Sequence, residues 1–185
     1  LLLKLEAINW ILAHHTRDYF PFLDEYSNMC NRSTFYNTLG RLLFMEDSAQ
    51  KFKAFMMPIH NNLNMLAASS PQQFQTEAAK VSLIGNLRDL RGIAMATSSR
   101  RTYGLLFDWM YPNHMPMLLR AVEAWGDRPE VTTPLLKFVA EFVLNKTQRL
   151  TFESSSPNGI LLFREVSKLL VAYGQKVLNS PVQGE

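Results

Sequence analysis

Apolar residues recur every three or four positions along most of the chain, which is the spacing of one face of an α-helix. The clearest stretch is residues 83–95, LIGNLRDLRGIAM. Its apolar stripe consists of Leu83, Leu87, Leu90 and Ala94. We expect this stripe to be buried against neighbouring helices. Arg91 lies at its edge, and because an unpaired guanidinium is costly to bury, it should reach the rim or pair with an acid.

The same spacing, read together with capping and breaking residues, predicts about eight helices and no convincing strand. Their approximate bounds are 2–14, 34–45, 49–66, 71–96, 103–110, 115–125, 134–143 and 157–177. Pro58 should bend the third helix without ending it. Three helix starts combine a Ser or Thr cap with a following proline: Ser70-Pro71, Thr132-Thr133-Pro134 and Ser154-Ser155-Ser156-Pro157. In the last helix we expect these residues to face inward: Ile160, Phe163, Val166, Leu170, Val171 and Val177.

A short pattern of apolar residue, arginine, any residue and branched apolar residue occurs more than once. It appears around Arg120 and Arg164, with a weaker form at Arg41. Intervals of roughly 30 to 50 residues are typical of stacked helical repeats. We therefore predict an all-α fold made of one segment, residues 1–185, with about four helical hairpins. Their approximate bounds are 1–46, 48–97, 99–126 and 131–180.

Composition narrows the class of protein without identifying it. With 185 residues, 47% of them hydrophobic, and a mean hydropathy of -0.08, the chain can fill a core. The net charge of +3 is spread without a dense run, so a nucleic-acid partner is possible but has no support in the charge pattern. Cys30 is the only cysteine, which excludes an internal disulfide framework and favours a reducing compartment. No uncharged apolar run approaches the roughly 20 residues of a membrane span. The chain starts without Met and in mid-pattern, so we expect it to be a piece of a longer protein.

Few residues suggest chemistry. His14 and His15 point about 100° apart on a helix and cannot hold one ion together, whereas His60 and His114 have no neighbouring ligand in sequence. We therefore predict no metal, cofactor or catalytic residue. The best candidates for binding an acidic partner are Arg88, Arg91, Arg100 and Arg101. The alternative is that Arg91 bridges two repeats and the others are solvated.

Several stretches carry a family resemblance. Leu90-Arg91-Gly92-Ile93-Ala94 is similar to the second helix of HEAT repeats. The chain as a whole resembles exportin-7 and its Ran-binding-protein relatives, a family of the importin-β (karyopherin) superfamily. The matching stretches are residues 34–43, 88–94, 109–112, 132–137 and 154–165. The match covers essentially all 185 residues and is looser at residues 49–75 and at the ends.

The resemblance implies an α-solenoid of HEAT- or armadillo-like hairpins in a right-handed superhelical stack. It also implies a central segment of a monomeric nuclear transport receptor, not an enzyme, which exports protein cargo and shuttles between nucleus and cytoplasm. Its expected partners are the GTPase Ran in its GTP form, protein cargo and Phe-Gly-repeat nucleoporins, with no membrane contact. In this family the second helix of each hairpin lines the concave side. This nominates as partner-binding residues Arg88, Asp89, Arg120, Arg164 and Lys168, beside Arg91, Arg100 and Arg101.

Three other functions stay open from the sequence. The chain could be a HEAT-repeat scaffold that holds proteins together without dependence on Ran. A helical enzyme would need carboxylates or histidines gathered from different hairpins. A basic RNA-binding solenoid would need salt-sensitive affinity for RNA and aromatic residues stacked on one face.

Overall fold

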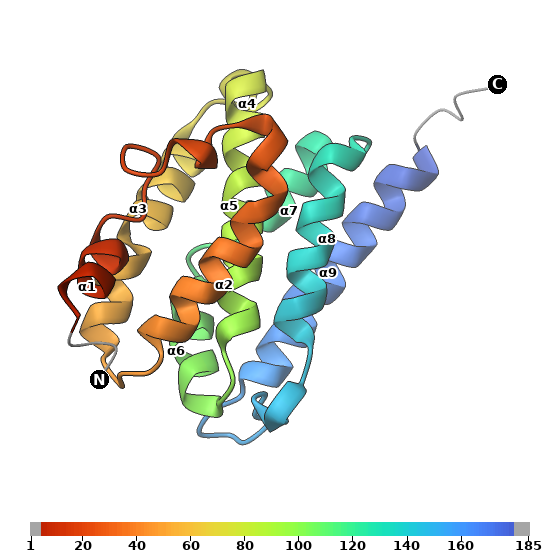
Figure 1. Ribbon diagram of the computed structural model, residues 1–185. Helices are drawn as coiled ribbons and strands as arrows, with labels where there is room; N and C mark the ends of the chain where they lie inside the picture. The colour runs from red at the N-terminus through yellow and green to blue at the C-terminus, as the bar shows by residue number, and fades with distance from the viewer. Residues whose placement is uncertain (1–4, 180–185) are drawn as a thin grey trace.

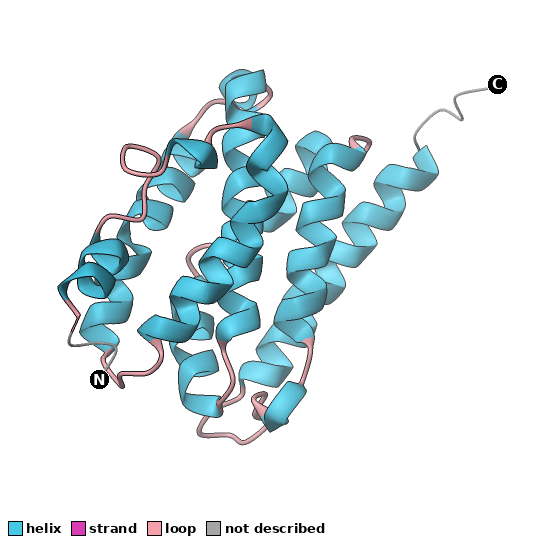
Figure 2. Ribbon diagram, viewed as in Figure 1, coloured by secondary structure: helices cyan, strands magenta, loops and turns pink. Residues whose placement is uncertain are grey.

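The computed structural model describes residues 5–179, which form helices joined by short loops (Figure 1). The α-helices are α1 (Glu6–Ala13), α2 (Arg32–Leu43), α3 (Ala49–Ala68), α4 (Pro71–Phe74), α5 (Glu77–Ala96), α6 (Arg100–Met110), α7 (Met115–Trp125), α8 (Pro129–Val143) and α9 (Asn158–Asn179). Short 3-10 helices cover Pro21–Leu23, Tyr26–Asn31 and Lys146–Gln148. No strand occurs within residues 5–179, as Figure 2 shows. The predicted all-α class is therefore confirmed.

The helices pack in two layers. In one layer α2 lies against α5 and α5 against α8, so these three helices form a row. In the other layer α1 contacts α3 and α7 contacts α9, while α3 packs on α5 across the two layers (Figure 1). Neighbour-to-neighbour packing of this kind is the arrangement of a helical solenoid. The hairpin boundaries and the handedness of the stack stay predictions.

The row depends on small residues where α2 approaches α5. A Cβ atom added at Gly92 would lie 2.4 Å from the Ser33 carbonyl oxygen. At Gly40, an added Cβ would lie 2.7 Å from the Ala96 Cβ. The Ser33 hydroxyl also donates a hydrogen bond to the Arg88 carbonyl oxygen, at 2.8 Å. Glycine at these positions is therefore what allows the two helix backbones to come together.

The predicted stripe on α5 is confirmed as the centre of the core. Leu83, Leu87, Leu90 and Ala94 are at most 1% exposed. The helix itself begins later than predicted. Ser70 forms its expected capping box, but with the single turn of α4. Thr76 then caps α5 by accepting a hydrogen bond from the Ala79 N–H, because the chain is extended at Thr76.

Two other predictions about helix ends and faces were wrong. α8 begins at Pro129, which supplies a first-turn proline earlier than the predicted Thr132 cap, and Thr132 is buried inside the helix. On α9, Leu162 and Leu169 are the buried leucines. The residues predicted to face inward but found exposed are Ile160, Phe163, Leu170, Val171 and Val177. Because α9 is apolar on more than one side, helical spacing alone did not select the side that meets α7.

Two further observations concern a membrane-spanning helix and a metal site, neither of which the sequence predicts. None of the helices between residues 5 and 179 combines the length and apolar character needed to cross a membrane. In the same residues, no three His, Cys, Asp or Glu side chains gather where they could hold one metal ion.

Candidate interaction sites

Several of the predicted partner-binding residues hold parts of the fold together. The Arg120 guanidinium donates to the carbonyl oxygens of Leu66, Ala67 and Ser69 at 2.6–2.9 Å, and it lies 4.2 Å from the centre of the Phe74 ring. It therefore satisfies the carbonyl groups left free at the end of α3. Arg100 donates to the Gln148 carbonyl oxygen at 3.0 Å, and Arg101 to Asp47 at 2.8 Å.

On α9, the two predicted cations share one acid. Arg164 and Lys168 lie 2.9 and 3.2 Å from the same carboxylate oxygen of Glu165. Arg164 also donates to the Tyr111 hydroxyl at 2.7 Å. Both side chains are exposed, so a partner can reach them by replacing their contacts with Glu165 and Tyr111.

Asp89 was predicted to face a partner, and the structure corrects this. Its side chain is 1% exposed and accepts two hydrogen bonds from Arg32, at 2.7 Å from Nε and 2.5 Å from Nη2. Burial raises the pKa of Asp89 to about 6, although the Arg32 guanidinium favours the ionised form. Asp89 lies on the side of α5 that faces α2, and the helix phase alone did not show that this side is covered.

Arg88 and Arg91 differ from the other predicted residues. Both are partly buried, and the Nε atom of each is buried without a hydrogen-bond partner. No ion pair joins either guanidinium to an acid among residues 5–179. Arg91 thus reaches the rim of the packed face, which was one of the two outcomes predicted from the sequence. The guanidinium groups of Arg88 and Arg91 remain available to a hydrogen-bond acceptor on another molecule.

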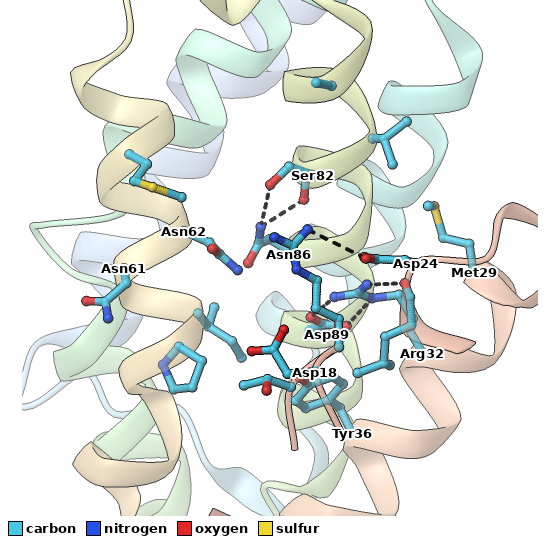
Figure 3. A pocket seen from close by; sticks show the side chains of 18 of the residues that line it. Asp18, Asp24, Met29, Arg32, Tyr36, Asn61, Asn62, Ser82, Asn86 and Asp89 are labelled. Atoms are coloured by element: carbon cyan, nitrogen blue, oxygen red, sulfur yellow. Dashed lines mark hydrogen bonds and ion pairs between the residues drawn. The ribbon is translucent and has the colours of Figure 1, made fainter. Parts of the chain in front are cut away.

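Figure 3 shows a cavity of about 640 Å³ beside the Arg32–Asp89 ion pair. It lies between α3, α5 and the segment before α2. Its walls mix apolar, amide and charged side chains, among them Leu23, Met29, Pro58, Asp18, Asn62 and Asn86. The ion pairs of Arg17 with Asp24 and of Arg32 with Asp89 already join most of its charges. Sequence reasoning missed this cavity because its walls come from segments far apart in the chain.

Asn86 supplies a buried hydrogen-bond acceptor without a partner at this cavity. Its amide nitrogen donates to the Ser82 carbonyl oxygen at 2.8 Å, while its Oδ1 is buried without a donor. In Figure 3, Asn62 from α3 and Asn86 from α5 point into the same space. The cavity can therefore accept a hydrogen bond from a small polar group.

A second cavity, of about 490 Å³, contains the histidines that seemed isolated in sequence. His60 Nδ1 and His114 Nε2 lie 3.0 Å apart, and Asn64 contacts His60 Nε2 at 2.9 Å. Burial and the neighbouring His60 lower the pKa of His114 to about 4. A neutral imidazole has one donor and one acceptor nitrogen, so neutral His114 can share one hydrogen bond with His60. Only the fold brings this pair together, since 54 positions separate the two residues.

Arg149 is a buried, multiply bonded arginine that the sequence analysis did not single out. Its side chain is 0% exposed and donates to carbonyl oxygens of Ala94, Thr97, Leu144 and Glu141. It also lies 4.8 Å from the centre of the Tyr103 ring. This arginine fastens the carboxyl ends of α5 and α8 to the loop before α9, which is a structural role. The one sequence signal was an arginine inside the apolar surroundings of Leu150 and Phe152.

Comparison with known proteins confirms the resemblance inferred from the sequence. The chain is 46% identical to exportin-7-B of Xenopus laevis over an alignment 186 positions long, which covers 96% of the chain and 17% of that protein. It is 43% identical to human Ran-binding protein 17 over 96% of the chain and 17% of that protein. It is 42% identical to Ran-binding protein 16 of Drosophila melanogaster over 100% of the chain and 18% of that protein. The chain thus spans about a sixth of the length of these relatives. No protein-family model matches it, and no solved structure does.

Proposed function

Because this chain is homologous along nearly its whole length to a segment of exportin-7 and of the Ran-binding proteins 16 and 17, we propose that it forms part of a nuclear transport receptor. The complete receptor carries protein cargo out of the nucleus in a Ran-GTP-dependent way. It shuttles between nucleus and cytoplasm as a monomer and passes the pore by binding Phe-Gly-repeat nucleoporins. The segment acts by binding proteins, without a catalytic role.

The observation that carries this proposal is the extent of the similarity. Identities of 42–46% extend across at least 93% of the chain, with relatives from a frog, an amoeba, a fly and a mammal. Their names describe export and Ran binding. Since only about a sixth of each relative is covered, the contacts with Ran or cargo can lie in this segment or elsewhere in the receptor.

The fold supports the proposal because its stacked helices allow the curvature of the chain to change. Each helix of the row α2, α5, α8 contacts its neighbours in sequence order, so small rotations at each contact add up to a change in curvature. A receptor that binds cargo and Ran-GTP to the same curved state gains affinity for each in the presence of the other. Hydrolysis of GTP then lowers the affinity for cargo, which is released.

The test is retention of the full-length protein on immobilised Ran locked in the GTP or the GDP state. The proposal predicts retention by the GTP form and little by the GDP form. Equal retention by both forms would favour the scaffold alternative, in which the same helical array organises proteins without regard to nucleotide. Shuttling is tested separately, because repeated bleaching of the cytoplasm should deplete a fluorescent nuclear pool of the full-length protein.

A further inference from the structure

We propose that the exposed face of the row α2, α5 and α8 binds an acidic peptide segment of a partner protein. The contacting residues are Arg41 of α2, Arg88 and Arg91 of α5, and Lys137 of α8, which we call the cationic face. This inference concerns the surface of the segment itself and does not depend on Ran. It holds or fails separately from the proposed transport function.

The first observation is that these four cations have no partner within residues 5–179. Nearly all the other lysines and arginines there contact an acid or a carbonyl oxygen, as Arg120 and Arg149 do. Lys53 on α3 is the one further cation in the described part of the chain without such a contact. Unpartnered cations are thus concentrated on the three helices of the row.

The second observation is that no acid of the row is left to neutralise them. Lys80 binds both Glu77 and Glu130, at 2.8 and 3.4 Å. Asp89 is held by Arg32, and Glu141 by Lys146 at 2.7 Å. Helix α2 contains no Asp or Glu. The cationic face therefore carries uncompensated positive charge, which attracts carboxylates.

Contacts between the helices place these residues on one side of the row. Gly92, one residue after Arg91, lies against Ser33 and Asn37 of α2, and Arg41 follows Asn37 by one helical turn. On the other side, Lys146 joins Glu141 of α8 to the Met95 carbonyl oxygen of α5. Lys137 precedes Glu141 by one turn and is exposed, as Arg41 is. The cations therefore line the two seams of α5 with its neighbours.

The partly buried arginines favour a peptide over a simple anion. Arg88 and Arg91 have buried Nε atoms without acceptors, so their side chains are held in place before a ligand arrives. Asn37 lacks a hydrogen-bond donor instead of an acceptor, because its Oδ1 is buried without a partner. A carboxylate supplies acceptors for the guanidinium groups, and a peptide N–H supplies a donor for Asn37. Phosphate groups at neutral pH mainly accept hydrogen bonds and do not serve both.

The experiment measures binding of the full chain to a fluorescein-labelled 12-residue peptide in which glutamates alternate with glycine and serine. The same peptide with glutamine in place of glutamate is the charge control. Arg88→Gln combined with Arg91→Gln should weaken binding of the acidic peptide by about tenfold or more. The double variant Arg41→Gln, Lys137→Gln, which alters exposed residues alone, should weaken it by roughly three- to tenfold and guards against a folding defect in the first.

The matched control is Arg17→Gln with Lys51→Gln, two exposed residues outside the row, which removes the same charge elsewhere. This control should keep the peptide affinity within about twofold. Equal loss in the control would mean that net charge, not the cationic face, attracts the peptide, and would overturn the proposal. Tighter binding of a 12-nucleotide single-stranded DNA that is lost in the Arg88 and Arg91 variant would overturn it in favour of a phosphate-binding surface. Absence of peptide binding by the unaltered chain at low salt would also refute it.

Discussion

Arg32 on α2 and Asp89 on α5 are joined by two hydrogen bonds inside the protein, with the Asp89 side chain 2% exposed and that of Arg32 13% exposed. Arg32 also donates to the Leu23 carbonyl oxygen at 2.5 Å, so it ties the segment before α2 to the row. The pair fixes how α2 lies on α5. It also forms the wall of the cavity in Figure 3.

Replacing Arg32 with Met should lower the free energy of unfolding by about 3–5 kcal/mol, because it leaves the Asp89 carboxylate buried without a counter-charge. Urea denaturation followed by circular dichroism measures this loss. The double variant Arg32→Met, Asp89→Leu should recover part of the stability, since no charge is then left buried. The exposed pair Arg17 and Asp24 offers the control: Arg17→Met should cost less than about 1 kcal/mol. Equal losses for both arginines would contradict this view of the buried pair.

Arg149→Met should destabilise the chain by about 3 kcal/mol or more, because carbonyl oxygens at the ends of α5 and α8 lose a buried donor. The comparison is Arg101→Met, which removes one exposed contact with Asp47 and should change the unfolding free energy by less than about 1 kcal/mol. Thermal unfolding of the two variants side by side gives the answer. A loss at Arg149 no larger than at Arg101 would exclude the fastening role.

Gly92→Ala should destabilise the protein, although alanine is the better helix former, because the new Cβ would meet the Ser33 carbonyl oxygen at 2.4 Å. Gly104 in α6 is the matched control, since a Cβ there meets nothing within 4 Å. Gly104→Ala should stabilise the protein by about 0.5–1 kcal/mol. Chemical denaturation should therefore show changes of opposite sign, and changes of the same sign would mean that α2 and α5 are farther apart than described.

His15 should make stability depend on pH. Its side chain is 1% exposed and stacks on Phe55 at 4.1 Å, and burial lowers its pKa from 6.5 to about 4. Because the unfolded chain binds this proton more tightly, the contribution of neutral His15 is complete above pH 6.5 and is lost as the pH falls toward 4. The loss is up to about 3 kcal/mol.

The variant His15→Gln isolates this effect. Asp89 acts in the opposite direction, since its pKa of about 6 lies above the ordinary 3.8 and its contribution is lost as the pH rises. Asp89 is present in both proteins, so it cancels when their unfolding free energies are subtracted at each pH between 7 and 4. The unaltered chain should lose more stability over this range than the variant. A difference that does not change with pH would show that His15 titrates normally.

The elements that could be predicted from sequence are those governed by local spacing. The stripe on α5 was correct because its apolar positions meet neighbours on several sides, so the choice of inward face was forced. On α9 the same rule failed, since Phe163 and Leu162 are both apolar and only the position of α7 decides between them. The cap at Ser70 was recognised, whereas the cap predicted at Thr132 was wrong and the cap at Thr76 was missed. The sequence did not show that the helix starts at Ser70 and Thr76 lie so close.

The candidate sites were harder to predict, because each depends on residues distant in sequence. Arg88 and Arg91 were singled out by residue type, but the proposal that they form a site rests on finding no acid near them, which the fold alone reveals. Asp89 was assigned to the surface because its partner, Arg32, is 57 positions away. Arg149 and the pair of His60 and His114 were missed for the same reason.

The most direct test of the central claim is the equilibrium affinity of the full-length protein for Ran, measured with the GTP-locked and GDP-locked forms and repeated with saturating protein cargo. A transport receptor should bind the GTP form at least about tenfold more tightly, and cargo should raise that affinity further because linkage is reciprocal. Equal affinity for the two nucleotide forms, unchanged by cargo, would contradict the claim that this chain belongs to a Ran-dependent exporter.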